Sequence, residues 1–275
     1  MSKADQIFID NCRRILDEGV LQKGDVRPKW EDGRPARTIK LFGLVNRYNL
    51  QEEFPILTVR PVPLYNCIDE LLWIWQKKSN RVDELNSRIW DAWAFEDGTI
   101  GKAYGYQLGK LSHYSDGNFD QVDRILKDIK ENPESRRLIC NMYQIDELHE
   151  MALYPCAYSM TFHVDGKKLN GILNQRSQDM LVANGWNVCQ YAILMHMVAR
   201  HTSLIPGELV HVIADAHIYD RHIPMVQDLM TRTQYEAPEL VIDPSIQSFY
   251  EFKADSFKLM NYEHGEQIKN IPVAV

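Results

Sequence analysis

The middle of the sequence constrains the fold more than any other part. In MTFHVDGKKLNGILNQRS (160–177), two runs of β-forming residues flank Asp165-Gly166, a dipeptide typical of hairpin turns. WNVCQYAILMHMVARHTSL (186–204) is apolar on nearly every side and predicts a long buried helix. ELVHVIADAHIYD (208–220) predicts a further strand. These segments combine strands with a buried helix and indicate an α+β fold.

Other segments predict further helices. The first residues form an amphipathic pattern that ends near Gly19, and PLYNCIDELLWIWQKK (63–78) predicts a largely buried helix. FDQVDRILKDIKENPESRRL (119–138) predicts a helix that stops before Pro133, followed by a strand. No stretch has the composition of an interdomain linker, so we expect residues 1–275 to form a single α+β domain.

Charge and cysteine content exclude several classes of function. The formal net charge of −7 gives no basic surface for nucleic acid, so a bound anion needs a local arginine cluster. The five cysteines are dispersed without a CxxC pair, which argues against disulfides and zinc and favours a reducing, cytoplasmic setting. The histidine pairs are five residues apart, a poor helical spacing for a metal. No apolar run is long enough to predict a transmembrane helix.

Three stretches carry polar side chains where an apolar strand begins or ends, which is where sites are commonly built. They are LYPCAYSMTF (153–162) with Cys156, NQRSQDM (174–180) with Gln175, Arg176, Ser177 and Asp179, and ADAHIYDRH (214–222) with Asp215, His217 and Tyr219. A lone cysteine is usually a small buried hydrophobe, so the residues alone allow packing or a nucleophilic role for Cys156. Ser177 lacks the G-x-S-x-G pattern of a hydrolase nucleophile.

Two further features suggest chemistry. Glu70 lies among apolar residues of the predicted helix 63–78, where a carboxylate needs a partner or has a function. Arg136-Arg137 is either a solvated pair or an anion clamp, since guanidinium groups match phosphate oxygens. GYQLGK (105–110) lacks the spacing of a P-loop, and no motif for NAD is present.

Several of these blocks resemble the thymidylate synthase family in order and spacing. MALYPCAYSMTF, NQRSQDM, WNVCQYA and IADAHIYDRH are similar to segments of that family, as are EFPILTVRP, DELLWIWQ, IWDAWA, GKAYGYQ, ENPESRRL and the final IPVAV. The resemblance covers nearly the whole chain. It implies a single α+β domain with a mixed β-sheet flanked by helices, and a homodimer in which this sheet packs against its twin.

The resemblance also implies a reaction. The family converts dUMP to dTMP with 5,10-methylenetetrahydrofolate as one-carbon donor and hydride source, and it needs no metal, NAD or flavin. Cys156 would attack C6 of uracil, which divides one difficult step into easier ones. Arg176 beside it would favour the thiolate. The other residues expected to be catalytic are Glu70 as a proton relay near O4, Tyr104 near the C5 proton, and Asp215.

The resemblance implies two binding sites. For dUMP, Asn187 would read the uracil edge, because an amide can donate to O4 and accept from N3–H. Arg27 is the expected phosphate ligand from the 21–38 loop, with Arg34 or Arg37 as alternatives. The other expected dUMP residues are Arg176, Ser177, Gln175, Asp179, His217, Tyr219, and Arg136 and Arg137 of the partner subunit. The expected folate residues are Arg60, Ile89, Trp90, Trp93, Asp179, Val182, Trp186 and Val275.

Two alternatives remain at this stage. A deoxynucleotide hydroxymethylase acting on dUMP or dCMP would share the cysteine and the folate, but water instead of hydride would quench the intermediate; Trp90 and the C-terminal tail favour the synthase. A non-catalytic nucleotide- or RNA-binding homologue is the second alternative. The excess of acidic over basic residues argues against a large surface that binds the phosphates of RNA.

Overall fold

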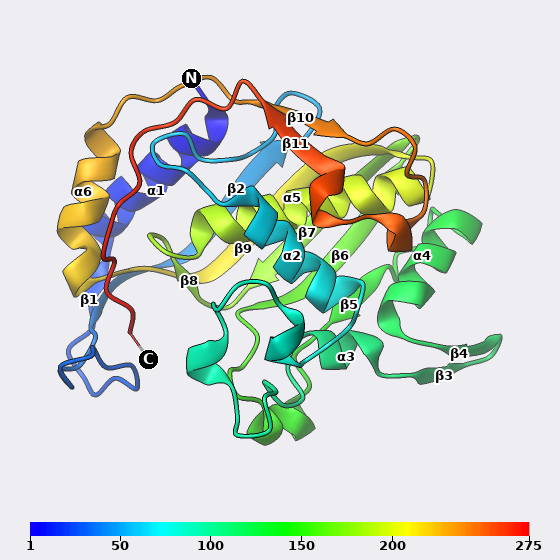
Figure 1. Cartoon of the computed structure of the whole chain (residues 1–275), viewed down its shortest axis with the longest axis horizontal. Helices are drawn as coiled ribbons and strands as arrows, with labels where there is room; N and C mark the ends of the chain where they lie inside the picture. The colour runs from blue at the N-terminus through cyan, green and yellow to red at the C-terminus, as the bar shows by residue number, and fades with distance from the viewer. Residues whose placement is uncertain (275) are drawn as a thin grey trace.

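A mixed β-sheet forms the centre of the molecule (Figure 1). The structure is a computed structural model that describes residues 1–274. The strand order is β1-β2-β9-β7-β6-β5, with β8 beside β9. The strands are β1 (Val20–Leu21), β2 (Thr38–Asn49), β5 (Ile139–Asn141), β6 (Ala157–Asp165), β7 (Lys168–Gln175), β8 (Gln178–Asp179) and β9 (Ile205–Tyr219). β7 and β8 run parallel to β9 and the other pairs are antiparallel, which confirms the predicted mixed sheet.

Helices cover one face of this sheet (Figure 1). α5 (Asn184–His201) packs on β7 and β9, α1 (Lys3–Glu18) packs on β2, and α2 (Leu64–Trp75) lies on α5. The other helices are α3 (Gly105–Gly109), α4 (Gln121–Glu131) and α6 (Ile223–Thr231). Two small antiparallel sheets pair β3 (Ser112–Tyr114) with β4 (Gly117–Phe119) and β10 (Glu239–Ile242) with β11 (Phe257–Met260). The helices predicted from periodicity are thus confirmed with small shifts in their bounds; α5, for example, begins at Asn184 and ends at His201.

Local sequence explains where these helices start and end. The Ser2 hydroxyl accepts a hydrogen bond from Ala4 N at 3.1 Å and caps α1, which ends before Gly19. The face of α1 that carries Phe8 and Ile15 is fully buried. α5 has no polar face because it lies between the sheet and α2, so nearly all of its side chains are buried.

The predicted β6–β7 hairpin is present, but its turn is one residue later than expected. Asp165 pairs with Lys168, so the central residues are Gly166 and Lys167 and not Asp165-Gly166. Gly166 has φ +59° and Lys167 has no positive φ, the pattern of a type II′ turn with glycine first. The preference of Gly166 for positive φ therefore set the register.

The face of the sheet opposite the helices exposes apolar side chains. Val45 is 57 % exposed, Ile139 51 % and Ile172 39 %, whereas their strand neighbours Leu44 and Leu173 are buried on the helix side. Alternation along a strand places the two sets on opposite faces. A sheet with one helix-covered face and one partly apolar open face is suited to packing against another layer.

Candidate active site

Cys156 and Arg176 form the centre of the candidate site. Arg176 Nη2 lies 3.7 Å from the Cys156 sulfur. The guanidinium also donates to the Pro155 carbonyl from Nε at 3.0 Å and to the Tyr154 carbonyl from Nη2 at 2.6 Å. These two main-chain contacts hold the positive charge against the thiol.

Cys156 differs from the other cysteines in its surroundings. Cys12, Cys67, Cys140 and Cys189 are fully buried, as predicted for core residues, whereas Cys156 is half-buried at the start of β6. Burial raises the pKa of the Cys156 thiol, and the charge of Arg176, a contact with Tyr104 and the charge of Arg27 all oppose that rise. An accessible cysteine facing a cation has the environment of a reactive thiol.

Tyr104 contacts the cysteine through the main chain. Its phenol oxygen accepts a hydrogen bond from Cys156 N at 2.9 Å, and its ring packs edge-on against Trp90 at 5.3 Å. Tyr104 has φ +45°, which is uncommon for an aromatic residue and indicates local strain. The next residue, Gly105, starts α3 where a side chain would collide with the main chain of Ser79. Strained backbone thus places a phenol beside the candidate nucleophile.

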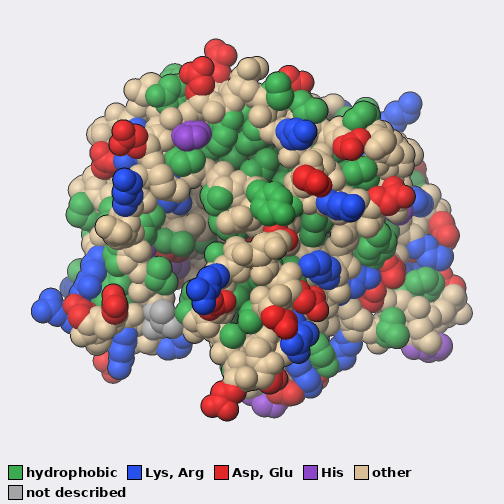
Figure 2. All heavy atoms as spheres, in the orientation of Figure 1, with side chains coloured by type: hydrophobic (Ala, Val, Ile, Leu, Met, Phe, Trp, Pro, Cys, Tyr) green, Lys and Arg blue, Asp and Glu red, His purple; other side chains and the backbone are tan. Residues whose placement is uncertain are grey.

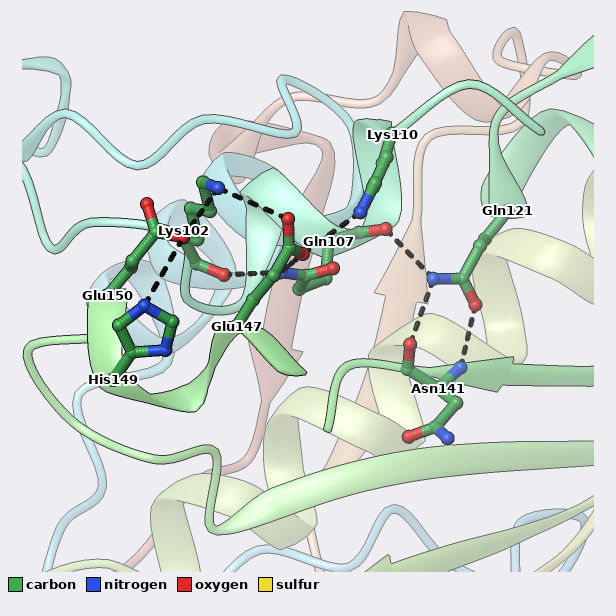
Figure 3. Close-up of polar contacts among 8 residues, drawn as sticks. All are labelled: Lys102, Gln107, Lys110, Gln121, Asn141, Glu147, His149 and Glu150. Atoms are coloured by element: carbon green, nitrogen blue, oxygen red, sulfur yellow. Dashed lines mark hydrogen bonds and ion pairs between the residues drawn. The ribbon is translucent and has the colours of Figure 1, made fainter. Parts of the chain in front are cut away.

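A polar network surrounds α3, the short helix that follows Tyr104 (Figure 3). Glu147 contacts Lys102 at 3.2 Å, Gln107 at 2.9 Å and Lys110 at 3.0 Å. The hydrogen bond from Gln107 and the two lysines lower the pKa of Glu147 to about 2. Gln121 joins α3 to β5, since its Nε2 donates to the carbonyls of Gln107 and Asn141 and its Oε1 accepts from Asn141 N. The start of α3 is therefore fixed relative to the sheet.

Glu70 is a buried carboxylate with three side-chain donors. Trp90 Nε1 donates to Oε1 and Trp186 Nε1 donates to Oε2, each at 2.6 Å, and Gln190 also donates to Oε2. Burial raises the pKa of Glu70, and the three hydrogen bonds oppose the rise. A carboxylate can lie within this apolar helix because its hydrogen-bond donors come from the Trp90 loop and from α5.

Asn187 is connected to Glu70 through α5. Its Oδ1 accepts from Gln175 Nε2 at 3.1 Å, and its Nδ2 donates to Gln190 Oε1 at 3.3 Å. Sequence reasoning did not include Gln190. The available signal was a polar residue within the apolar run WNVCQYAIL, three positions after Asn187 on the same helix face.

A cavity of about 220 Å³ opens at the end of β9. Its lining includes Arg176, Ser177, Asp215, His217 and Tyr219, so residues from two of the predicted stretches meet there. His217 Nδ1 lies 2.8 Å from Asp215 Oδ1, and the Asp215 carboxylate also faces Lys40 at 3.5 Å. Asp215 therefore lies at the rim, where it orients His217, and it does not contact Cys156.

The 21–38 loop is ordered around Trp30. The Trp30 ring is buried against Tyr219 and His222, and its Nε1 donates to Asp220 Oδ1 at 3.0 Å. Arg221 lies over the same ring at 5.0 Å. A long loop rich in proline, glycine and charge is therefore pinned to the end of β9.

The candidate phosphate ligands differ in whether other groups of the protein already bind them. Arg37 donates to the Lys23 carbonyl at 2.7 Å and Arg34 faces Asp32 at 3.7 Å. Arg27 is exposed, and its charge acts on Cys156 and Tyr219. Arg136 and Arg137 are exposed before β5, outside the lining of the cavity, and within residues 1–274 neither side chain has an ion pair. The chain thus brings Arg176 and Arg27 toward the site but not the arginine pair.

Aromatic and aliphatic side chains form a wall next to Glu70. Trp90 packs edge-on against Trp93 at 5.9 Å, and Ile89 and Val182 expose apolar surface. Figure 2 shows a hollow between the C-terminal segment and the loop that follows α2. Arg60, expected to face a folate tail, is instead 8 % exposed and donates to the Leu181 carbonyl at 2.6 Å. Val275 lies outside the described residues.

Asp179 connects the β8 loop to the C-terminal segment. Its Oδ1 accepts from Leu181 N at 2.9 Å and Val182 N at 3.1 Å, and its Oδ2 lies 3.8 Å from His222 Nδ1. Burial raises the pKa of Asp179, but the contact with His222 and the nearby His217 outweigh it, so the net pKa is lowered. His222 Nε2 faces the Pro272 carbonyl at 2.8 Å. The tail is thereby tied to a residue next to the site.

Two properties of the described residues concern metal binding and membrane insertion. Residues 1–274 hold no group of three or more His, Cys, Asp or Glu side chains arranged to bind a metal ion. None of the helices in this part of the chain has the length and hydropathy needed to cross a bilayer.

Comparisons with known proteins agree with the geometry. The family model described as thymidylate synthase matches residues 6–275. Thymidylate synthase 1 of Bacillus subtilis (strain 168) and the thymidylate synthase of Bacillus phage phi3T are each 44 % identical, with 98 % of both chains covered. The solved structure of thermostable thymidylate synthase A from Bacillus subtilis is 43 % identical, with a TM-score of 0.94 and 99 % of each chain covered.

Proposed function

Because the chain belongs to the thymidylate synthase family, we propose that Cys156 and Arg176 carry the covalent step by which it converts dUMP to dTMP. The protein is a methyltransferase that uses methylenetetrahydrofolate as co-substrate. The observation that supports the assignment is the 3.7 Å contact between the Cys156 sulfur and a guanidinium held by main-chain carbonyls. The alternatives of a hydroxymethylase and a binding protein are not favoured by the relatives.

The covalent step uses the thiolate of Cys156. Its sulfur adds to C6 of uracil, and the electron pair of the C5–C6 double bond moves toward O4, so C5 becomes a nucleophile. Arg176 stabilises the thiolate before the addition, since burial alone disfavours the charged form. Covalent catalysis of this kind divides one high barrier into smaller ones.

Glu70 and Tyr104 transfer protons to and from the uracil base. A carboxyl group whose pKa is raised by burial is suited to exchanging protons with O4 through water. The Tyr104 phenol is held next to Cys156 by the hydrogen bond from the Cys156 N–H, and we assign it to the removal of the C5 proton. Both groups are held by packing rather than by flexible loops.

The nucleotide is held by groups from β7 to β9, from α5 and from the 21–38 loop. Asn187 reads the uracil edge, and His217 and Tyr219 hold the 3′-hydroxyl, with His217 oriented by Asp215. Gln175 and Asp179 support this set. The phosphate is held by Arg176, Ser177 and Arg27; Arg27 is favoured over Arg34 and Arg37 because those two already have partners within the loop.

The folate co-substrate supplies the one-carbon unit and the hydride. The side chains that would hold it fit a flat, largely apolar ring system, because they offer indole faces and exposed aliphatic groups beside a carboxylate. They are Ile89, Trp90, Trp93, Asp179, Val182 and Trp186; Val275, which lies outside the described residues, is proposed to contact the folate as well. Arg60 acts by holding the Leu181 carbonyl next to Val182, since its guanidinium is buried there.

A homodimer completes the phosphate site. The open sheet face with Val45, Ile139 and Ile172 supports such packing, because a sheet face that carries apolar side chains is stabilised by burial against another layer. Arg136 and Arg137 lie just before β5, an edge strand of that sheet, and are available to reach the partner's cavity.

A contiguous core from α1 to β11 supports a single domain. The five free cysteines support a cytoplasmic location, where thiols stay reduced.

The covalent step is tested by trapping. The protein is incubated with 5-fluoro-dUMP and methylenetetrahydrofolate, digested, and analysed by mass spectrometry. The adduct is expected on the peptide that contains Cys156. Label on another peptide, or an active enzyme that forms no adduct, would refute the assignment.

A further inference from the structure

A chain of hydrogen bonds runs from His211 on β9 to Glu70 on α2 and passes through the Asn187 amide. His211 Nε2 lies 2.8 Å from Gln175 Oε1, and Gln175 Nε2 donates to Asn187 Oδ1 at 3.1 Å. Asn187 Nδ2 donates to Gln190 Oε1, and Gln190 Nε2 donates to Glu70. We infer that His211 is a positioning residue that fixes the direction of the Asn187 amide through Gln175 and thereby sets the preference for uracil over cytosine. The inference rests on the proposed role of Asn187.

A main-chain partner fixes the direction of the Gln175 amide. Gln175 Nε2 also lies 3.1 Å from the Ser177 carbonyl, which can only accept a hydrogen bond. The atom that faces Ser177 must therefore be the amide nitrogen, and the oxygen Oε1 must face His211. Because an amide oxygen only accepts, the proton of the imidazole must be on Nε2 of His211.

His211 is a neutral donor near pH 7. It has no exposed surface, and burial lowers its pKa to about 3. A neutral imidazole has one N–H, so with the proton on Nε2 its Nδ1 is an acceptor. Among residues 1–274, Nδ1 of His211 has no partner, and its cross-strand neighbour Asn46 has a buried amide nitrogen without one. This donor and this acceptor are complementary only in the Nε2–H tautomer.

The other end of the chain is fixed in the same way. Gln190 Nε2 donates to the Cys67 carbonyl at 3.2 Å as well as to Glu70, so its Oε1 must face Asn187. Gln178 Nε2 donates to the Asp179 carbonyl at 3.2 Å and lies 3.4 Å from Asn187 Oδ1. Rotating the Asn187 amide by 180° would place its nitrogen against two NH₂ groups and its oxygen against the Gln190 oxygen.

The direction of this amide separates the two pyrimidines. Uracil offers an acceptor at O4 and a donor at N3, whereas cytosine offers a donor at N4 and an acceptor at N3. The observed direction leaves a second Nδ2 hydrogen for O4, and Oδ1 can accept from N3–H in place of its long 3.4 Å contact with Gln178, which matches uracil. The reversed amide would match cytosine. Loss of the His211 donor leaves Gln175 Oε1 buried and unpaired, which weakens the constraint on Asn187.

The test compares His211→Phe with His211→Gln, which keeps a side-chain N–H donor. The readout is the ratio of kcat/KM for dUMP to that for dCMP, or the ratio of their dissociation constants by titration where dCMP turnover is undetectable. Because both values are measured on the same sample, any misfolded protein affects them equally and leaves their ratio unchanged. His196→Phe is the matched control. Burial lowers the pKa of His196 as well, but among the described residues its side chain makes no hydrogen bond to the series that links His211 to Glu70.

We expect the ratio to fall about 10-fold in His211→Phe, as for one lost buried hydrogen bond, and to return to within about 3-fold of wild type in His211→Gln. His196→Phe should leave it unchanged. A ratio within about 2-fold of wild type in His211→Phe, or an equal loss in His211→Gln, would overturn the inference. Asn187→Asp tests the role of Asn187 separately from that of His211. If Asn187→Asp shifts the ratio while His211→Phe does not, the proposed role of Asn187 is supported and the inferred role of His211 is refuted.

Discussion

Arg176 holds its Nη2 atom 3.7 Å from the sulfur of Cys156 while its guanidinium is bound to the carbonyls of Pro155 and Tyr154. The charge therefore faces the thiol in the free protein and offsets part of the effect of burial on its pKa. A site arranged in this way needs no rearrangement to stabilise the thiolate.

The first prediction concerns the sulfur. Cys156→Ser should lower kcat by more than about 1,000-fold, because a hydroxyl is a far weaker nucleophile, while dUMP still binds. Dihydrofolate absorbance measures turnover and titration calorimetry measures binding. Cys12→Ala, a change of a buried cysteine in α1, serves as the control and should keep turnover. Substantial turnover by the serine variant would contradict the covalent mechanism.

The second prediction concerns the two subunits. Arg136→Ala and Cys156→Ser should each be inactive or weak as homodimers. Refolded together, they should recover about a quarter of wild-type activity, since half of the random dimers contain one intact site. Steady-state assays of the mixture measure this recovery. Absence of recovery in a mixture shown by native mass spectrometry to contain hybrid dimers would exclude donation of Arg136 across the interface.

The third prediction concerns base recognition. Asn187→Asp should shift preference from dUMP toward dCMP by at least about 10-fold, because an ionised carboxylate cannot donate to O4. Competition between the two nucleotides in one assay gives the ratio directly. Unchanged discrimination would mean that another residue reads the base edge.

The fourth prediction concerns the indole groups around Glu70. Trp186→Phe removes a hydrogen bond that lowers the Glu70 pKa, so that pKa should rise and the acid limb of the kcat–pH profile should move to higher pH. Trp93→Phe removes an indole of the same wall that has no hydrogen bond to Glu70. Equal shifts in both variants would argue for a general packing effect.

The fifth prediction concerns the anchor of α3. The pKa of Glu147 lies near 2 in the folded protein, below its ordinary 4.5, so this group stabilises the fold above pH 4.5 and loses that effect as pH falls toward 2. The free energy of unfolding of Glu147→Gln, measured by urea titration, should be lower than wild type near pH 7, and the two should converge at acid pH. Asp146→Asn, an exposed neighbour, should match wild type throughout.

Much of the fold could be predicted because it depends on local patterns. The apolar run of α5 and the alternation in β9 indicate buried elements whatever the rest of the chain does. The hairpin turn was misplaced by one residue because Asp165-Gly166 and Gly166-Lys167 both suit a tight turn, and only the pairing of Asp165 with Lys168 separates them.

The site was predicted less completely, since its key contacts join distant segments. Glu70 was recognised as a carboxylate in need of partners, but Trp186 and Gln190 lie more than a hundred positions away and resemble ordinary packing residues. The burial of Arg60 had no local signal, because arginine is usually exposed. His211 was hidden in the same way within an apolar strand, where its partner Gln175 comes from the parallel neighbour β7.

The buried ring of Trp30 has a thermodynamic consequence for ligand capture. A segment as long as 21–38, if left to fluctuate, would lose conformational freedom on closing around a phosphate, at a cost of about 1–2 kcal/mol for each residue that becomes ordered. Here folding has already ordered this segment, since Trp30 donates a hydrogen bond to Asp220 and packs edge-on against Tyr219 and His222. Arg27 is thus displayed on a preorganised support, and the entropy that would have opposed nucleotide association is removed in advance.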